Sequence, residues 1–258
     1  MSTLNITIVQ ADLHWHDAAA NRHAFARVID ANSEDSDLIV LPEMFSTGFS
    51  MAAPDLAESM DGPTVNWLAE QAARSGAAVC GSLIIEESGR YYNRFLFFGP
   101  DGERHTYDKR HLFRLADEHE HYAAGVERKV FSYRGVRICP QVCYDLRFPV
   151  WSRFRDDYDL LLYVANWPDR RHHAWATLIR ARAIENQCFV AAVNRTGTDG
   201  NALPYKGGSA VIDFLGEDLL DVGGQVATGT AEIDLETMRS FRERFAFYKD
   251  ADRFTLLD

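Results

Sequence analysis

The sequence has few cysteines. Four occur among 258 residues, too few for a disulfide framework in a chain of this size, so we expect free thiols. Cys139 and Cys143 have Pro140 between them, and no second pair with matching spacing follows, so the pattern does not predict a zinc site. We therefore expect no metal ion, and each cysteine is either a buried, inert side chain or a nucleophile.

The sequence also lacks an excess of positive charge and a long apolar segment. Lys and Arg number 27 against 38 Asp and Glu, for a net charge of −11, which argues against a nucleic-acid partner because phosphate binding needs clustered cations. The longest apolar run, Leu160 to Ala165, is too short to cross a bilayer, and the first five residues lack the features of a signal peptide. We expect a soluble, cytoplasmic protein with no membrane contact.

Linker-like stretches and internal repeats are missing as well. The 17 glycines are scattered, and no Pro-, Gly- or Ser-rich stretch separates two halves. With 47% hydrophobic residues, the chain can fill a substantial core. We predict one domain that covers residues 1–258.

What is present is an alternation of short β-rich runs with helical patterns. The runs around Leu38 and Leu160 are apolar on nearly every residue, as expected for strands buried on both faces. The turn at 99–102 joins two neighbouring runs, so part of the sheet is antiparallel. These features predict an α/β fold. We expect strands at 5–10, 37–41, 77–85, 91–98, 103–107, 136–142, 159–165, 187–194 and 208–214, helices after Asp17, at 63–76 and at 173–185, and a last strand and helix within 231–242.

Three reactive side chains come within two residues of the end of a predicted strand, namely Glu43, Lys109 and Cys143. Catalytic groups of α/β proteins gather beyond the carboxyl ends of strands, where the chain turns and side chains converge. The positions therefore predict one site that is assembled from three distant segments.

These residue types can cleave an amide together. A partly buried carboxylate can take a proton from the thiol and return it to a leaving amine, and a fixed ammonium can stabilise the oxyanion. The turn that follows Val142 resembles the strand-to-helix elbow that places a nucleophile beside free backbone N–H groups. Taken singly, each residue has an ordinary alternative: an inert buried thiol, a solvated loop carboxylate or a surface lysine.

A cysteine–histidine pairing is the main alternative chemistry, because nine histidines are available and His111 is close to Lys109. The local sequences around the four cysteines do not match the signatures of cysteine peptidases. The sequence therefore favours a carboxylate as the base.

Three motifs resemble the ordered signatures of the nitrilase, or carbon–nitrogen hydrolase, superfamily. They are Leu-Pro-Glu at 41–43, Tyr-Asp-Lys-Arg-His-Leu-Phe at 107–113 and Val-Cys-Tyr-Asp-Leu-Arg-Phe-Pro at 142–149. The resemblance continues through Ala-Asn-Trp-Pro at 165–168 and Arg-Ala-Arg-Ala-Ile-Glu-Asn-Gln at 180–187, and so covers essentially the whole chain. It implies a four-layer α-β-β-α sandwich with two mixed sheets, and a homodimer whose interface involves residues 173–185 and the C-terminal segment.

The resemblance also implies roles for the reactive residues. Glu43 matches the general base, Lys109 the lysine that holds the oxyanion and Cys143 the nucleophile, with the backbone N–H of Tyr144 as a second oxyanion donor. A second glutamate is expected shortly before Ala124-Gly125, where Glu118 is the best match and Glu120 the alternative. The reaction needs no metal or organic cofactor.

Within the superfamily, the chain looks most similar to bacterial omega-amidases, which hydrolyse the terminal amide of 2-oxoglutaramate and related short monoamides of dicarboxylic acids. The distal carboxylate of such a substrate needs a cation, and a small pocket needs walls. The candidates for the cation are Arg147, Arg170, Arg171 and Arg195, with a structural ion pair as the alternative for Arg147, and those for the walls are Phe45, Tyr144 and Trp167.

Two rival functions use the same residues or the same fold. A true nitrilase, or an amidase acting on another small amide or N-carbamoyl compound, would need the same nucleophile, base and lysine. A catalytically silent binding protein would keep the fold alone. Relative rates on a nitrile and an amide distinguish the enzymes, and an unreactive thiol at Cys143 would favour the silent protein.

Overall fold

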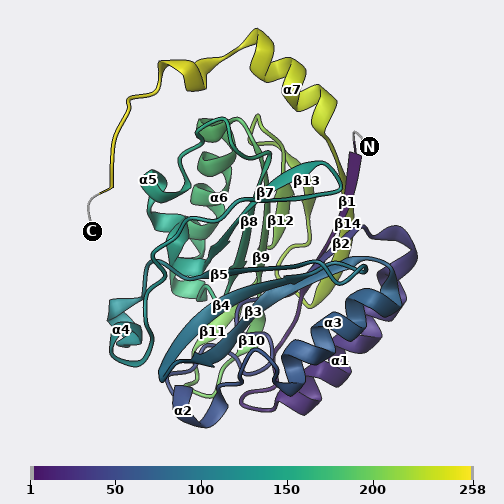
Figure 1. Ribbon diagram of the computed structural model, residues 1–258, viewed down its shortest axis with the longest axis vertical. Coiled ribbons are helices and arrows are strands. Elements are labelled where there is room, and N and C mark those ends of the chain that lie inside the picture. Colours follow the sequence, from purple (N-terminus) through teal and green to yellow (C-terminus); the bar gives the residue numbers. More distant parts are fainter. Residues whose placement is uncertain (1–2, 257–258) are drawn as a thin grey trace.

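The computed structural model describes residues 3–256, which form two six-stranded sheets (Figure 1). In spatial order, the first sheet contains β14 (Ala227–Asp234), β1 (Thr3–Gln10), β2 (Leu38–Val40), β3 (Ala78–Glu87), β4 (Arg90–Phe98) and β5 (Arg104–Asp108). The second contains β13 (Asp218–Asp221), β12 (Ala210–Ile212), β9 (Phe189–Asn194), β8 (Leu160–Ala165), β7 (Val136–Val142) and β6 (Phe131–Tyr133).

Both sheets are mixed. In the first, β1, β2 and β3 are parallel, whereas β14, β4 and β5 join through antiparallel pairs. In the second, β7, β8 and β9 are parallel and the outer strands are antiparallel. Since β4 is antiparallel to both β3 and β5, the carboxyl ends of β2, β3 and β5 point toward the same edge.

The layers follow from which side each strand residue faces. Leu38 and Val40 pack into the core between the sheets, and Ile39 packs into the core under the helices. Helices α1 (Ala18–Asn32) and α3 (Pro63–Ser75) lie side by side on one flank, and α6 (His172–Asn186) covers the other (Figure 1). The predicted α-β-β-α sandwich is confirmed, and β2 is apolar throughout because both of its faces are buried.

Local sequence signals set the helix ends as predicted. The side chain of Asp17 accepts a hydrogen bond from the N–H of Ala20 at 2.9 Å and so caps α1. Pro63 occupies the first turn of α3, and Gly76 ends this helix with a left-handed φ of 72°.

Short elements escaped prediction. Strand β6, and the hairpin of β10 (Thr196–Thr198) and β11 (Pro204–Lys206), have three residues each and β13 has four, too few for a clear periodic pattern, whereas β12 lies within the strand expected at 208–214. The strand expected at 187–194 begins at Phe189, because Gln187 ends α6 with a left-handed φ of 49°. The short α2 (Ala53–Leu56), α4 (Glu118–His121) and α5 (Pro149–Ser152) were likewise not expected.

The C-terminal segment leaves the sandwich as an arm. Strand β14 leads into α7 (Leu235–Arg244), and the chain then continues past α5 and α6 toward the C-terminus (Figure 1). The arm is attached where Arg242 contacts the buried Asp159 and where Gln187 donates to the carbonyl of Phe245. Between residues 3 and 256, no helix is long and apolar enough to cross a membrane.

Candidate active site

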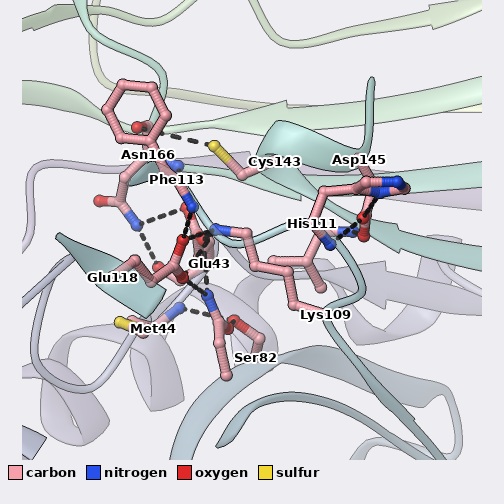
Figure 2. Close-up of polar contacts among 12 residues, drawn as sticks. Glu43, Met44, Ser82, Lys109, His111, Phe113, Glu118, Cys143, Asp145 and Asn166 are labelled. Carbon is pink, nitrogen blue, oxygen red and sulfur yellow. Dashed lines mark hydrogen bonds and ion pairs between the residues drawn. The ribbon is translucent and has the colours of Figure 1, made fainter. Parts of the chain in front are cut away.

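Glu43, Lys109 and Cys143 come together at the carboxyl ends of β2, β5 and β7 (Figure 2). The Nζ atom of Lys109 lies 3.0 Å from Oε1 of Glu43. Cys143 belongs to the facing sheet and lines the adjoining cavity. The predicted convergence of three distant segments is therefore present in the fold.

Glu118 completes a buried ionic cluster, which we call the site cluster and which consists of Glu43, Lys109 and Glu118. Both carboxylate oxygens of Glu118 lie 2.9 Å from Nζ of Lys109, and all three side chains have 0% exposure. Glu120, the alternative, has a side chain that is 66% exposed and contacts His119. The structure thus brings Glu118, and not Glu120, to the lysine.

Two carboxylates share one ammonium in this cluster, and the pKa values reflect the imbalance. Burial raises the pKa of Glu118; the charge of Lys109 opposes this rise and that of Glu43 adds to it. Burial lowers the pKa of Lys109, but the charges of Glu118 and Glu43 outweigh burial and hold it above its usual value. The lysine is therefore a cation at neutral pH, and Glu118 binds a proton more readily than an isolated glutamate does.

Cys143 occupies a turn that presents its thiol. It is the first residue of the 3-10 turn after β7 and has a left-handed φ of 45°. Its Sγ lies 3.9 Å from the carbonyl oxygen of Asn166 (Figure 2). Burial and then the charge of Glu43 raise the pKa of the thiol well above its ordinary value. The resting side chain is thus a thiol that needs a base at the moment of attack.

Asn166 holds Glu43 from the second sheet. Its backbone N–H donates to Oε2 of Glu43 at 2.7 Å, and its Nδ2 donates to the backbone carbonyl of Glu43 at 2.6 Å. The Ala-Asn-Trp-Pro motif contains this residue, but nothing in the motif assigns it a role. Through these contacts, Asn166 connects Glu43 to the carboxyl end of β8, beside the thiol of Cys143.

Asn93 and Ser82 are further site residues that the sequence analysis missed. Nδ2 of Asn93 donates to Oε1 of Glu43 at 2.7 Å, and Oγ of Ser82 donates to Oδ1 of Asn93 at 2.8 Å. The only sequence signal for Asn93 is its place as a polar residue shortly before the apolar run Phe-Leu-Phe-Phe at 95–98. Ser82 in β3 gave no signal that separates it from ordinary core serines.

Asp145 joins the lysine segment to the turn that carries the nucleophile. Its buried carboxylate accepts hydrogen bonds from the N–H of Val142 at 3.0 Å, the N–H of His111 at 2.9 Å and the hydroxyl of Tyr107 at 2.8 Å. Tyr107 and His111 flank Lys109 in sequence. One carboxylate therefore connects the segment that carries Lys109 to the turn that carries Cys143.

A cavity of about 480 Å³ opens beside the thiol. Tyr144 and Trp167 line it, as predicted for its walls, and so do three of the four arginines proposed for a substrate carboxylate. The guanidinium of Arg147 lies 5.0 Å from the ring of Trp167. The lining relevant to recognition consists of Cys143, Tyr144, Arg147, Trp167, Arg170 and Arg171.

Two predictions about the cavity are wrong, and one alternative is not realised. Phe45 does not line it, because its ring packs under the helices at 5.6 Å from the ring of Phe25. Arg195 is buried outside it and binds Asp12 at 2.7 Å. The structural ion pair considered as the alternative for Arg147 is not formed within residues 3–256, where its guanidinium lies over the ring of Trp167 instead.

The described part of the chain offers no group of three or more His, Cys, Asp or Glu side chains that could hold a metal ion. All four cysteines are buried free thiols. Of the four, Cys143 lines the cavity.

Comparison with known proteins agrees with this geometry. The family model for carbon–nitrogen hydrolase matches residues 5–243. Omega-amidase YafV of Yersinia enterocolitica is 50% identical over 258 residues and covers 100% of both chains, and 2-oxoglutaramate amidase of Bacillus subtilis is 35% identical over 95% of this chain and 96% of its own. A crystal structure of a CN-hydrolase superfamily protein from Xanthomonas campestris, with an arsenic adduct in its active site, superposes with a TM-score of 0.96 at 50% identity, over 99% of this chain and 100% of that one.

Proposed function

The chain belongs to the carbon–nitrogen hydrolase family, and from this premise we propose that it is an omega-amidase. It hydrolyses the terminal amide of short dicarboxylic acid monoamides, such as 2-oxoglutaramate, to the acid and ammonia. The observation that carries the proposal is a thiol at a cavity, next to a buried Glu-Lys-Glu cluster and facing three arginines. The omega-amidase and 2-oxoglutaramate amidase activities of the two relatives support the substrate class.

The first half-reaction forms a thioester. Glu43 takes the proton from Sγ of Cys143, and the sulfur forms a bond to the amide carbon. The ammonium of Lys109 and the N–H of Tyr144 hold the negative oxygen of the tetrahedral intermediate. The carbon–nitrogen bond then breaks, and Glu43 passes its proton to the nitrogen, which leaves as ammonia.

The second half-reaction releases the acid. Glu43 takes a proton from water, the resulting hydroxide attacks the thioester carbon, and the same donors hold the oxyanion. The carbon–sulfur bond breaks, and the sulfur recovers a proton from Glu43. Glu118 keeps the ammonium of Lys109 in place throughout and helps to position the amide.

Arg171 is the best candidate to bind the distal carboxylate. Burial and then the charge of Arg170 lower its pKa, so its positive charge lacks full compensation. Its guanidinium is fixed 4.7 Å from the ring of Phe113 on the cavity wall. A substrate carboxylate would supply the missing negative charge, with Arg147 and Arg170 nearby in the lining.

Ammonia release tests the proposal directly. The purified protein is incubated with 2-oxoglutaramate, succinamate and a simple nitrile, with the Cys143→Ala variant as control. Rapid release from the two amides that the variant abolishes supports omega-amidase activity. Release from the nitrile alone would replace the proposal with a nitrilase, and no release by a protein whose Cys143 reacts with iodoacetamide would reject this substrate class.

We propose a homodimer in the cytoplasm, with α6 and the C-terminal arm at the interface. Ile184 on α6 is 54% exposed and Phe247 on the arm is 62% exposed, as apolar residues of an interface would be in one isolated chain. Light scattering coupled to size-exclusion chromatography measures the molar mass in solution. A molar mass equal to that of one chain would contradict the dimer.

A further inference from the structure

We propose that Asn93 is a positioning residue that determines which oxygen of Glu43 acts as the base. The assignment rests on the proposed amidase function and deepens it. It concerns a side chain that is 0% exposed, that belongs to the middle of β4, and that no sequence motif identified.

The first step of the argument is the occupancy of the Glu43 carboxylate. Oε1 accepts from Nζ of Lys109 at 3.0 Å and from Nδ2 of Asn93 at 2.7 Å. A carboxylate oxygen has two lone pairs, so these two donors saturate Oε1. Oε2 has one short hydrogen bond, from the backbone N–H of Asn166 at 2.7 Å, and its second site is occupied only by a 3.5 Å contact from Nδ2 of the same residue.

The second step is the consequence for proton transfer. Because Oε1 is saturated, the thiol proton of Cys143 can pass only to the open site on Oε2. That oxygen is held by Asn166, whose backbone carbonyl lies 3.9 Å from the sulfur. Asn93 therefore leaves a single reactive oxygen and fixes the rotation of the carboxylate that presents it.

The third step explains why an amide suits this position. Ser82 accepts a hydrogen bond from the N–H of Met44 at 2.9 Å, so its own hydrogen is free to donate to Oδ1 of Asn93 (Figure 2). Because Oδ1 of Asn93 accepts this hydrogen bond, the NH₂ group on the other side of the amide points toward the carboxylates. The donor reaches Oε1 of Glu43 and, at 3.5 Å, Oε1 of Glu118.

The fourth step concerns charge. The site cluster already holds two carboxylates and one ammonium, all fully buried. A neutral donor stabilises the ionised form of the base without changing the net charge of the cluster. A carboxylic acid of the same shape would add a third acid, and an apolar residue would leave Oε1 with one donor and the hydroxyl of Ser82 unpaired.

The test compares Asn93→Asp, Asn93→Ala and Ser82→Ala with Asn186→Ala. Asn186 is the matched control because it is also 0% exposed and its amide binds only structural groups, namely the N–H of Phe154, the carbonyl of Arg182 and, at 3.4 Å, the carboxylate of Glu185. Each variant is assayed for kcat, KM and the pH profile of kcat/KM, and its free energy of unfolding is measured in urea.

The expected result is an ordered loss of kcat with KM little changed. Loss of general-base alignment lowers kcat by roughly 100-fold for Asn93→Asp, roughly 30-fold for Asn93→Ala and roughly 5-fold for Ser82→Ala. The acidic limb of the pH profile moves to higher pH in the same order, because the two Asn93 variants lose the donor to the ionised base and Ser82→Ala leaves that donor without its orienting partner. Asn186→Ala loses stability but keeps the wild-type pH profile.

Two outcomes would overturn the proposal. One is an Asn93→Ala variant that loses stability like Asn186→Ala while its pH profile stays in place. The other is a Ser82→Ala variant, which retains the amide, with kcat and pH profile identical to those of the wild type.

A substrate-independent readout separates this proposal from the proposed function. The rate at which iodoacetamide alkylates Cys143 is measured against pH in the wild type and in Asn93→Ala. A slower reaction in the variant supports positioning of the base even if no amide is hydrolysed, and equal rates at every pH would reject it even if the wild type is an active amidase.

Discussion

Two ion-pair clusters, each containing a buried carboxylate, are built in opposite ways in this molecule. The site cluster sets the carboxylates of Glu43 and Glu118 against the single ammonium of Lys109. The second, which we call the anchor cluster, sets the carboxylate of Asp159 against Arg137, Arg242 and Arg239 at 2.8, 3.2 and 3.7 Å. Carboxylates outnumber cations in the site cluster, and cations outnumber carboxylates in the anchor cluster.

The pKa values move in opposite directions accordingly. Burial raises the pKa of Glu118 despite Lys109. Burial also acts to raise the pKa of Asp159, but its hydrogen bonds to Arg137, with the charges of Arg137 and Arg242, outweigh burial and hold it below the usual value. The ionised carboxylate of Asp159 is therefore stabilised by its arginines, whereas the ionised carboxylate of Glu118 is not fully stabilised by its one lysine.

The two clusters therefore affect stability with opposite dependence on pH. Glu118 contributes stability that is fully present below its ordinary pKa and is lost as the pH rises through its raised value. Asp159 contributes stability that is present above its ordinary pKa and is lost as the pH falls through its lowered value. We therefore expect substitutions in the site cluster to lower activity and substitutions in the anchor cluster to lower the free energy of unfolding.

The largest effect is expected at the nucleophile. Cys143→Ala should lower the rate of ammonia release on the order of 1,000-fold or more, because no thioester can form. Cys139→Ala is the matched control, since burial raises the pKa of this thiol to about 11 and leaves it inert. If Cys143→Ala retained a tenth of the activity, the site would not act through this thiol.

The next effect is expected at the anchor. Asp159→Ala leaves the guanidinium of Arg242 buried without its carboxylate and should cost about 3–5 kcal/mol of unfolding free energy. Urea unfolding measures this loss, and kcat of the folded fraction should stay within about twofold of the wild type, since Asp159 contacts no site residue. A tenfold fall in that kcat would mean that the two clusters are not independent.

A smaller effect is expected for Arg171, the proposed ligand of the substrate carboxylate. Arg171→Ala should raise KM for 2-oxoglutaramate by roughly 10- to 100-fold and change kcat much less. A rise of this size corresponds to the binding free energy lost with one charge-assisted hydrogen bond. Arg180→Ala is the control, because Arg180 binds Asp218 outside the cavity. Equal KM values for the two variants would move the carboxylate site to Arg147 or Arg170.

The smallest effect is expected for Glu118→Gln on stability. The substitution removes a carboxylate whose raised pKa costs stability at neutral pH, so the unfolding free energy should differ from the wild type by about 1 kcal/mol or less at pH 7. Relative to the wild type, the variant should become more stable as the pH rises from 4 to 8. A relative stability that falls over this range would show that Lys109 dominates the pKa of Glu118.

The sequence predicted the parts of the site that lie at strand ends. Glu43, Lys109 and Cys143 stand where buried apolar strands stop, and their motifs made the convergence visible without coordinates. Phe45 was misplaced because the chain turns at Met44, whose φ is 42°, so that the ring enters the core under the helices. Such a reversal depends on one left-handed residue that no periodicity reveals.

The supporting residues could not be predicted, for a different reason. Asn93 and Ser82 lie inside strands, where an isolated polar residue equally fits a solvent-facing position. Their importance depends on register: β3 pairs Ser82 with Phe95 and Leu83 with Arg94, which brings Ser82 within reach of Asn93. Register is a property of the assembled sheet.

The left-handed backbone at Cys143 also limits which substitutions evolution can accept at the nucleophile position. Glycine adopts a φ of 45° without strain and asparagine at little cost, whereas β-branched residues do so at considerable cost. A lineage that no longer needs the reaction is therefore expected to keep the fold by replacing this cysteine with glycine or asparagine. In an alignment of relatives, the residue at this turn would indicate which of them have remained enzymes.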